Sequence, residues 1–253
     1  MKKPLIIANW KANPDSPGRA VSLARSIECG IARYRNVEVV IAPPYPFLLP
    51  VARVLRKSKL GAQDTSWHDT GPFTGEVSWH HLKHMGVKYV IVGHSERKIY
   101  FGESDSMINK KVQVLLQHGL IPILCIGERE RGGGEIPIMV GEQLKKALAG
   151  VRRNFIKNLV VAYEPIWAIS TMPDARPDTP DNAFRAMVYI RRVISNLYDR
   201  KTADLVRVIY GGSVKSKNIS LFLKEGRMEG ALVGGASLKA QEFAEIVAEA
   251  SII

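Results

Sequence analysis

The sequence predicts a (β/α)₈ barrel, a single α/β domain of eight parallel strands that spans residues 1–253. Short apolar runs rich in Val, Ile and Leu recur without alternating polar residues, as in strands buried on both faces. Eight such runs alternate with helix-like stretches, and eight strands close a barrel. The runs are Leu5–Trp10, Val37–Ala42, Lys59–Gln63, Tyr89–Gly93, Ile121–Ile126, Leu159–Tyr163, Val206–Tyr210 and Ala231–Val233.

Three long stretches between or after these runs have apolar residues at helical spacing. They are Ser104–His118, Pro180–Leu197 and Lys239–Ile253. Pro180 is well placed for the first turn of a helix, and Thr179 or Asp181 could cap that helix. An open doubly wound sheet is the structural alternative. A G-x-G-x-x-G turn after the first strand would favour that fold. Lys11-Ala12-Asn13-Pro14 stands there instead.

Composition favours a cytoplasmic protein with a large core. The apolar share is 46%, yet no segment approaches the roughly 18 apolar residues that a membrane helix needs. The apolar run Leu5–Ala8 is too short for a signal peptide. Cys29 and Cys125 form no C-x-x-C pair, so we expect two reduced thiols. The net charge of +12 could steer anions or attract nucleic acid, but no basic block occurs, which favours a generally basic surface.

Polar side chains stand at the carboxyl ends of the predicted strands, where such barrels carry their active sites. These residues are Asn9, Lys11, Gln63, His94, Glu96, Cys125, Glu128 and Glu164. Glu164 is the most telling of them, because it ends an apolar strand and precedes Pro165. A carboxylate in that position must be solvated, paired or functional.

Two glycine-rich turns follow the last two strands, at Gly211-Gly212-Ser213 and Gly234-Gly235. Without Cβ atoms, the backbone N–H groups of such turns can approach an anion closely. Glycine pairs also occur in ordinary tight turns. Their place after strands seven and eight matches the usual phosphate site of these barrels, which favours phosphate binding.

Several segments resemble the triosephosphate isomerase family, after which the TIM barrel is named, and they occur in the order of the family's motifs. They are Ala8-Asn9-Trp10-Lys11, Val92-Gly93-His94-Ser95-Glu96-Arg97, Cys125-Ile126-Gly127-Glu128, Ala162-Tyr163-Glu164-Pro165-Ile166-Trp167-Ala168, Tyr210-Gly211-Gly212-Ser213-Val214 and Leu232-Val233-Gly234-Gly235-Ala236-Ser237-Leu238.

The resemblance implies an aldose–ketose isomerase of glycolysis and gluconeogenesis that interconverts dihydroxyacetone phosphate and D-glyceraldehyde 3-phosphate through an enediolate. It implies no cofactor, no metal ion, no nucleic acid and no membrane. Glu164 would be the base, His94 the electrophile, Lys11 a fixed positive charge and Asn9 a hydrogen-bond donor. The phosphate would bind the N–H groups of Ser170, Ser213, Gly234 and Gly235. Glu96 would be either a supporting carboxylate or a salt-bridge partner of a neighbouring Lys or Arg.

The segment after Glu164 departs from the family pattern. Ser170 and Met172 replace glycines, and the exit is about three residues longer and carries prolines that restrict the backbone. We expect altered closure over the site, with ordinary divergence as the alternative. The tract Arg129–Gly134 is also unusual, and we expect a mobile loop there.

The resemblance also implies a homodimer, with a tetramer as the other possibility. Thr74 and Glu76, within Gly71–Glu76, would reach into the neighbouring subunit, although Ala12 and Asp64 replace the more common Met and Asn.

Two other functions remain open at this point. A lyase similar to indole-glycerol-phosphate synthase would share Gly234-Gly235 without needing Asn9, Lys11, His94 and Glu164. A non-catalytic barrel that binds anions or nucleic acid would use the basic surface but would leave these four residues unexplained.

Overall fold

The computed structural model describes residues 2–131, 133–169 and 175–253, which contain a closed barrel of eight parallel strands. Each strand pairs with the next in sequence, and β8 pairs with β1. The strands are β1 (Leu5–Asn9), β2 (Glu38–Ala42), β3 (Lys59–Ala62), β4 (Tyr89–Val92), β5 (Ile121–Ile126), β6 (Val160–Tyr163), β7 (Arg207–Tyr210) and β8 (Gly230–Val233). The predicted barrel is confirmed, and the strand ends differ from those expected by no more than one residue.

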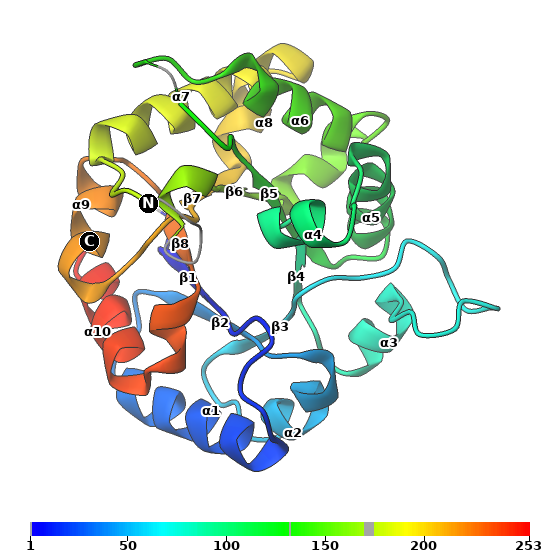
Figure 1. The fold of residues 1–253 in the computed structure, drawn as a ribbon, viewed down its shortest axis with the longest axis vertical. Helices are drawn as coiled ribbons and strands as arrows, with labels where there is room; N and C mark the ends of the chain where they lie inside the picture. The colour runs from blue at the N-terminus through cyan, green and yellow to red at the C-terminus, as the bar shows by residue number, and fades with distance from the viewer. Residues whose placement is uncertain (1, 132, 170–174) are drawn as a thin grey trace.

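Helices surround the strands, as Figure 1 shows. The α-helices are α1 (Pro17–Ile31), α2 (Leu48–Ala52), α3 (Trp79–His84), α4 (Ser95–Tyr100), α5 (Asp105–Gln117), α6 (Ile138–Leu148), α7 (Pro180–Leu197), α8 (Arg200–Leu205), α9 (Ser216–Lys224) and α10 (Ala240–Ser251). Short 3₁₀ turns are η1 (Tyr45–Phe47), η2 (Arg153–Asn158), η3 (Ile166–Ala168) and η4 (Gly235–Leu238). Thr179 caps α7 by accepting a hydrogen bond from the Asn182 N–H at 3.2 Å.

The strands are apolar on both faces because each face packs into a different core. In β1, Leu5 and Ile7 point into the barrel interior, whereas Ile6 and Ala8 pack in the layer beneath the helices. All four side chains are fully buried. This double burial explains why the strands lack alternating polar residues. No helix in the described part of the chain is long and apolar enough to cross a membrane.

Three polar side chains join distant strands at the amino end of the barrel. Glu38, at the start of β2, accepts hydrogen bonds of 2.6 Å from the Tyr89 hydroxyl of β4 and from Arg207 of β7. Burial alone would raise the pKa of the Glu38 carboxyl. The hydrogen bonds from Tyr89 and Arg207 outweigh burial and lower this pKa below its ordinary value of 4.5.

The lowered pKa of Glu38 makes its contribution to stability depend on pH. A carboxyl whose pKa is lower in the folded than in the unfolded state stabilises the fold above the unfolded value, and this stabilisation disappears as pH falls through the folded value. We therefore expect Glu38→Gln to lower the melting temperature near neutral pH. The difference from wild type should shrink as pH falls below about 4.5.

Thermal denaturation followed by circular dichroism over a pH series measures this difference. Glu135→Gln is the control, because Glu135 is exposed and its substitution should change the melting temperature little at any pH. A Glu38→Gln difference that stays constant or grows on acidification would contradict the expectation.

Candidate active site

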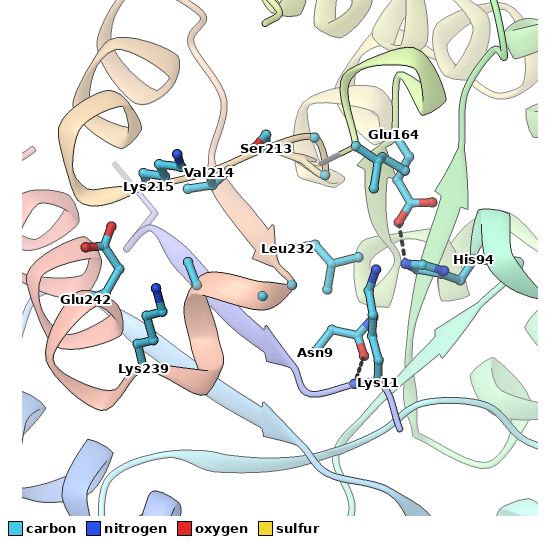
Figure 2. Close-up of a pocket in the computed structure, with 16 residues that line it drawn as sticks. Asn9, Lys11, His94, Glu164, Ser213, Val214, Lys215, Leu232, Lys239 and Glu242 are labelled. Carbon is cyan, nitrogen blue, oxygen red and sulfur yellow. Dashed lines mark hydrogen bonds and ion pairs between the residues drawn. The ribbon is translucent and has the colours of Figure 1, made fainter. Parts of the chain in front are cut away.

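A cavity of about 340 Å³ opens at the carboxyl ends of the strands. Asn9 and Lys11 enter it from the end of β1, His94 from the end of β4 and Glu164 from the end of β6 (Figure 2). The turns after β7 and β8 form the opposite wall. The barrel therefore brings together side chains that are far apart in the sequence, such as Asn9 and Glu164, which are 155 positions apart.

Glu164 and His94 face one another in this cavity. Their closest approach is 3.4 Å, between Glu164 Oε1 and His94 Nε2 (Figure 2). The other carboxylate oxygen, Oε2, accepts a hydrogen bond of 3.2 Å from the backbone N–H of Ser95, the first residue of α4. Glu164 is only 2% exposed, and Oε1 accepts no hydrogen bond from the described residues. Oε1 is therefore the oxygen available to a proton of a bound molecule.

His94 caps the amino end of α4, and this position determines where its ring carries a proton. Its Nδ1 accepts a hydrogen bond of 3.3 Å from the Glu96 N–H. A ring nitrogen that accepts from a backbone N–H carries no proton of its own. In its neutral form the ring therefore carries its proton on Nε2, which faces the cavity as a hydrogen-bond donor.

Lys11 has a left-handed backbone conformation, with φ of 52°, which is uncommon for a residue other than glycine. Two hydrogen bonds hold this conformation: the Lys11 N–H donates to Asn9 Oδ1 at 3.1 Å, and Gln63 Nε2, from the end of β3, donates to the Lys11 carbonyl at 2.8 Å. The Lys11 ammonium lies 2.5 Å from Glu96 Oε1. Glu96 therefore forms a salt bridge, one of the two roles considered for it, and its partner is a lysine of the cavity itself.

The two glycine-rich turns line the cavity beside Lys11. A Cβ atom on Gly234 would lie 3.4 Å from Lys11 Cε, so this turn is close to the lysine side chain. The Ser213 N–H donates to the Ala168 carbonyl at 3.1 Å in this structure. Ser213 must therefore exchange this partner before its N–H can bind a phosphate. Ser170, the fourth expected phosphate ligand, lies outside the described residues, as do Met172 and the rest of 170–174.

Gly211 has a second role that the sequence did not reveal. A Cβ atom at this position would lie 2.6 Å from Glu164 Cγ, far inside normal contact distance. Gly127 packs against the same residue from its backbone side, since a Cβ there would lie 1.8 Å from the Glu164 carbonyl oxygen. Both positions therefore need glycine for Glu164 to occupy its observed position. This constraint follows from contacts in the folded structure and is not visible in the sequence.

Charged side chains also line the outer part of the cavity, and the sequence did not single them out. Lys215, Lys239 and Glu242 lie at the side away from His94 (Figure 2). Glu242 Oε1 accepts a hydrogen bond of 2.8 Å from the Ser216 N–H at the start of α9. Among the described residues, no group of three or more His, Cys, Asp or Glu side chains is arranged to hold a metal ion.

A buried carboxylate, an imidazole N–H donor and an ammonium group therefore face one small cavity that also has backbone suited to a phosphate. This combination suits removal of a proton beside a carbonyl group, because the carboxylate can accept the proton while the two donors stabilise the resulting oxyanion.

Comparison with known proteins agrees with this geometry. The family model described as triosephosphate isomerase matches residues 4–250. The triosephosphate isomerase of Thermoanaerobacter sp. (strain X514) is 47% identical over 251 residues, which cover 98% of this chain and 99% of that protein. Those of Carboxydothermus hydrogenoformans and Dictyoglomus turgidum are 45% and 41% identical, with at least 98% of each chain covered. The chain belongs to the triosephosphate isomerase family.

Proposed function

We propose that this protein interconverts dihydroxyacetone phosphate and D-glyceraldehyde 3-phosphate through an enediolate. The pairing of Glu164 Oε1 with His94 Nε2 at 3.4 Å, inside a cavity that Lys11 also lines, carries this proposal. Family membership gives the substrates, because the matched relatives are named triosephosphate isomerases. The reaction belongs to glycolysis and gluconeogenesis, so we expect the protein in the cytoplasm. A lyase that shared only the Gly234-Gly235 turn would not need the Glu164–His94 pair.

In the first half of the reaction, Glu164 Oε1 takes a proton from the carbon beside the substrate carbonyl. The electron pair of the broken C–H bond forms the carbon–carbon double bond of the enediolate, and the carbonyl oxygen gains the negative charge. His94 Nε2–H donates to that oxygen and helps a proton pass between the two oxygens. Glu164 then returns its proton to the neighbouring carbon, which completes the isomerisation with no net gain or loss of atoms.

Lys11 and the glycine turns would hold the charged parts of the substrate. We assign the phosphate to the N–H groups of Ser213, Gly234 and Gly235, with Ser170 as a fourth ligand that lies outside the described residues. Lys11 offers a positive charge to the phosphate and to the enediolate, and Asn9 donates to a substrate oxygen. The closed barrel core beneath the cavity excludes water from one side, which protects an enediol phosphate from losing its phosphate.

Glu164→Gln should lower kcat by about 10²–10⁴-fold, because the amide cannot accept the carbon-bound proton. The fold should be retained, since Gln has nearly the same shape. A coupled assay with D-glyceraldehyde 3-phosphate measures turnover, and circular dichroism checks the fold. Glu242→Gln is the matched control, as Glu242 lines the same cavity away from His94 and should keep most of the activity. Wild-type turnover in Glu164→Gln would refute the mechanism.

Gly211→Ala tests whether the position of the Glu164 side chain determines kcat. The added methyl group would meet Glu164 Cγ at 2.6 Å and must displace the base. Because misplacement of a reacting group by about 1 Å can cost 10²-fold, we expect kcat to fall at least about tenfold while KM changes little. Gly18→Ala, where the added Cβ meets open space, is the control for the substitution itself. Equal kcat values in wild type and Gly211→Ala would show that Glu164 tolerates displacement.

We also propose a homodimer. The segment between β3 and α3 extends away from the barrel in Figure 1, and it contains Thr74, Glu76 and the exposed ring of Phe73. At the end of α4, Tyr100 and Phe101 are 66% and 69% exposed. Large exposed aromatic side chains are typical of surfaces that a partner covers.

Light scattering should therefore give a mass of about twice the 28.1 kDa of one chain, or about four times if dimers pair. Phe101→Asp should shift the mass toward one chain, because it places a charge in the proposed contact. A wild-type protein of one chain's mass at micromolar concentration would contradict the dimer.

A further inference from the structure

The turn that follows Glu164 is held by side-chain contacts that no local sequence pattern predicts. Trp167 lies in the middle of η3, three residues after Glu164. Two guanidinium groups lie over its indole ring: Arg131 Cζ is 5.7 Å and Arg176 Cζ is 5.1 Å from the ring centroid. Both distances fall within the range of cation–π attraction.

Arg131 acts on Trp167 through a buried carboxylate as well as directly. Glu128 is fully buried, and its Oε1 accepts hydrogen bonds from Trp167 Nε1 at 3.0 Å and from the Tyr163 hydroxyl at 2.8 Å. Arg131 Nη2 lies 3.0 Å from the same oxygen and also donates to the Tyr163 hydroxyl. Its side chain is only 4% exposed, so the ion pair is poorly screened by water. One carboxylate oxygen thus joins the ends of β5 and β6 to η3.

The Tyr163 hydroxyl keeps its proton in this environment. Burial is the main cause that raises the pKa of Tyr163 well above its ordinary value, and the nearby Glu128 charge raises it further. Tyr163 therefore remains a donor to Glu128, and Arg131 is the cation that balances the buried Glu128 charge. Removing that cation would leave a buried carboxylate without its counter-charge, a costly arrangement that forces the neighbouring groups to move.

Arg176 ties the chain on the other side of residues 170–174 to the same point. Its backbone N–H donates to the Trp167 carbonyl at 3.0 Å, and its guanidinium donates to the Arg131 carbonyl at 3.4 Å. Arg131 and Arg176 come from two parts of the sequence that are unusual for the family, the tract Arg129–Gly134 and the long exit. These two unusual segments therefore lie close together, because an arginine of each contacts Trp167.

Backbone hydrogen bonds connect this turn to the reacting groups. The Ile166 N–H donates to the Glu128 carbonyl at 2.9 Å, and the Glu164 N–H donates to the Ile126 carbonyl at 2.7 Å. At the other end of η3, the Ala168 carbonyl accepts from the Ser213 N–H, one of the proposed phosphate ligands. A shift of Trp167 would therefore change the positions of Glu164 and Ser213.

We propose that Arg131 and Arg176 are positioning residues for the isomerase reaction, which hold Trp167 against Glu128 and so fix the turn that follows the base. This proposal rests on the proposed function for its kinetic consequence, but not for its structural one. Arg131 has the larger effect, because it is buried and balances the Glu128 charge, whereas Arg176 is exposed.

The structural consequence is tested by ¹⁹F NMR of protein labelled with 5-fluorotryptophan. The chain has four tryptophans, and Trp167→Phe assigns the Trp167 resonance by its loss. In Arg131→Met and Arg176→Met we expect this resonance to shift or broaden while those of Trp10, Trp67 and Trp79 stay unchanged. Arg129→Met is the matched control, because Arg129 belongs to the same tract but is exposed and should leave the Trp167 resonance in place.

The kinetic consequence is tested on the same variants. Arg131→Met should lower kcat about tenfold with KM within about twofold of wild type, and Arg176→Met should lower kcat about twofold to threefold. Because both arginines act on one indole, the double variant should lose less than the product of the two single losses. Arg131→Lys should recover part of the kcat, since an ammonium can still balance Glu128.

Several outcomes would overturn the proposal. One is a Trp167 resonance that does not respond to either substitution, and another is a kcat that stays at the wild-type value although the resonance moves. Strictly multiplicative effects of the two substitutions would also overturn it. If Arg131→Met does not fold, Arg131→Lys and Arg176→Met provide the same readouts. Failure of the proposed function is distinguishable, because wild type would then lack isomerase turnover while the ¹⁹F response of Trp167 remained.

Discussion

The buried carboxylate of Glu164 is the constraint on which the rest of the site depends. A carboxylate that is only 2% exposed must have hydrogen bonds or a functional partner, because an isolated buried charge is costly. The start of α4 supplies the Ser95 N–H to one oxygen, and the other faces His94. Gly211 and Gly127 leave room for Glu164 in this position, because a Cβ atom on Gly211 would overlap its side chain and a Cβ atom on Gly127 would overlap its backbone carbonyl. Glu164, the helix and the two glycines thus form one steric and electrostatic unit.

Helix α4 can serve this unit only if it is itself held firmly. Arg97 of α4 lies 2.9 Å from Asp64, and Asp64 pairs with the buried Lys111 of α5 at 2.7 Å. Glu103 also pairs with Lys111, so that two carboxylates meet two cations. Burial raises the pKa of Asp64 despite the lowering effect of Lys111. The carboxylate that replaces the family's more common Asn therefore brings a charge that this cluster balances, and the cluster anchors α4 to β3 and α5.

The sequence predicted the strands and the residues at their ends because both depend on local patterns. A run of Val, Ile and Leu specifies a strand, and the residue after the run must stand at the mouth of the barrel, as Glu164 and His94 do. Contacts between different loops follow no such pattern. The tract that contains Arg131 was expected to be a mobile loop, yet Arg131 is buried against Glu128. No pattern in the tract indicates that Arg131 lies over the indole ring of Trp167, which follows the strand that ends at Tyr163. No pattern indicates that Arg176 lies over the same ring.

The proposed phosphate site and the proposed electrophile, His94, are linked through Glu96. Its carboxylate pairs with the Lys11 ammonium, and its backbone N–H donates to His94 Nδ1, which keeps the ring proton on Nε2. A phosphate dianion beside Gly234 would attract Lys11 away from Glu96, since the dianion carries the larger charge. The backbone N–H of Glu96 is unaffected by that exchange, because α4 holds it. The geometry therefore lets Lys11 move toward a bound phosphate while His94 keeps the tautomer that the proposed proton transfer requires.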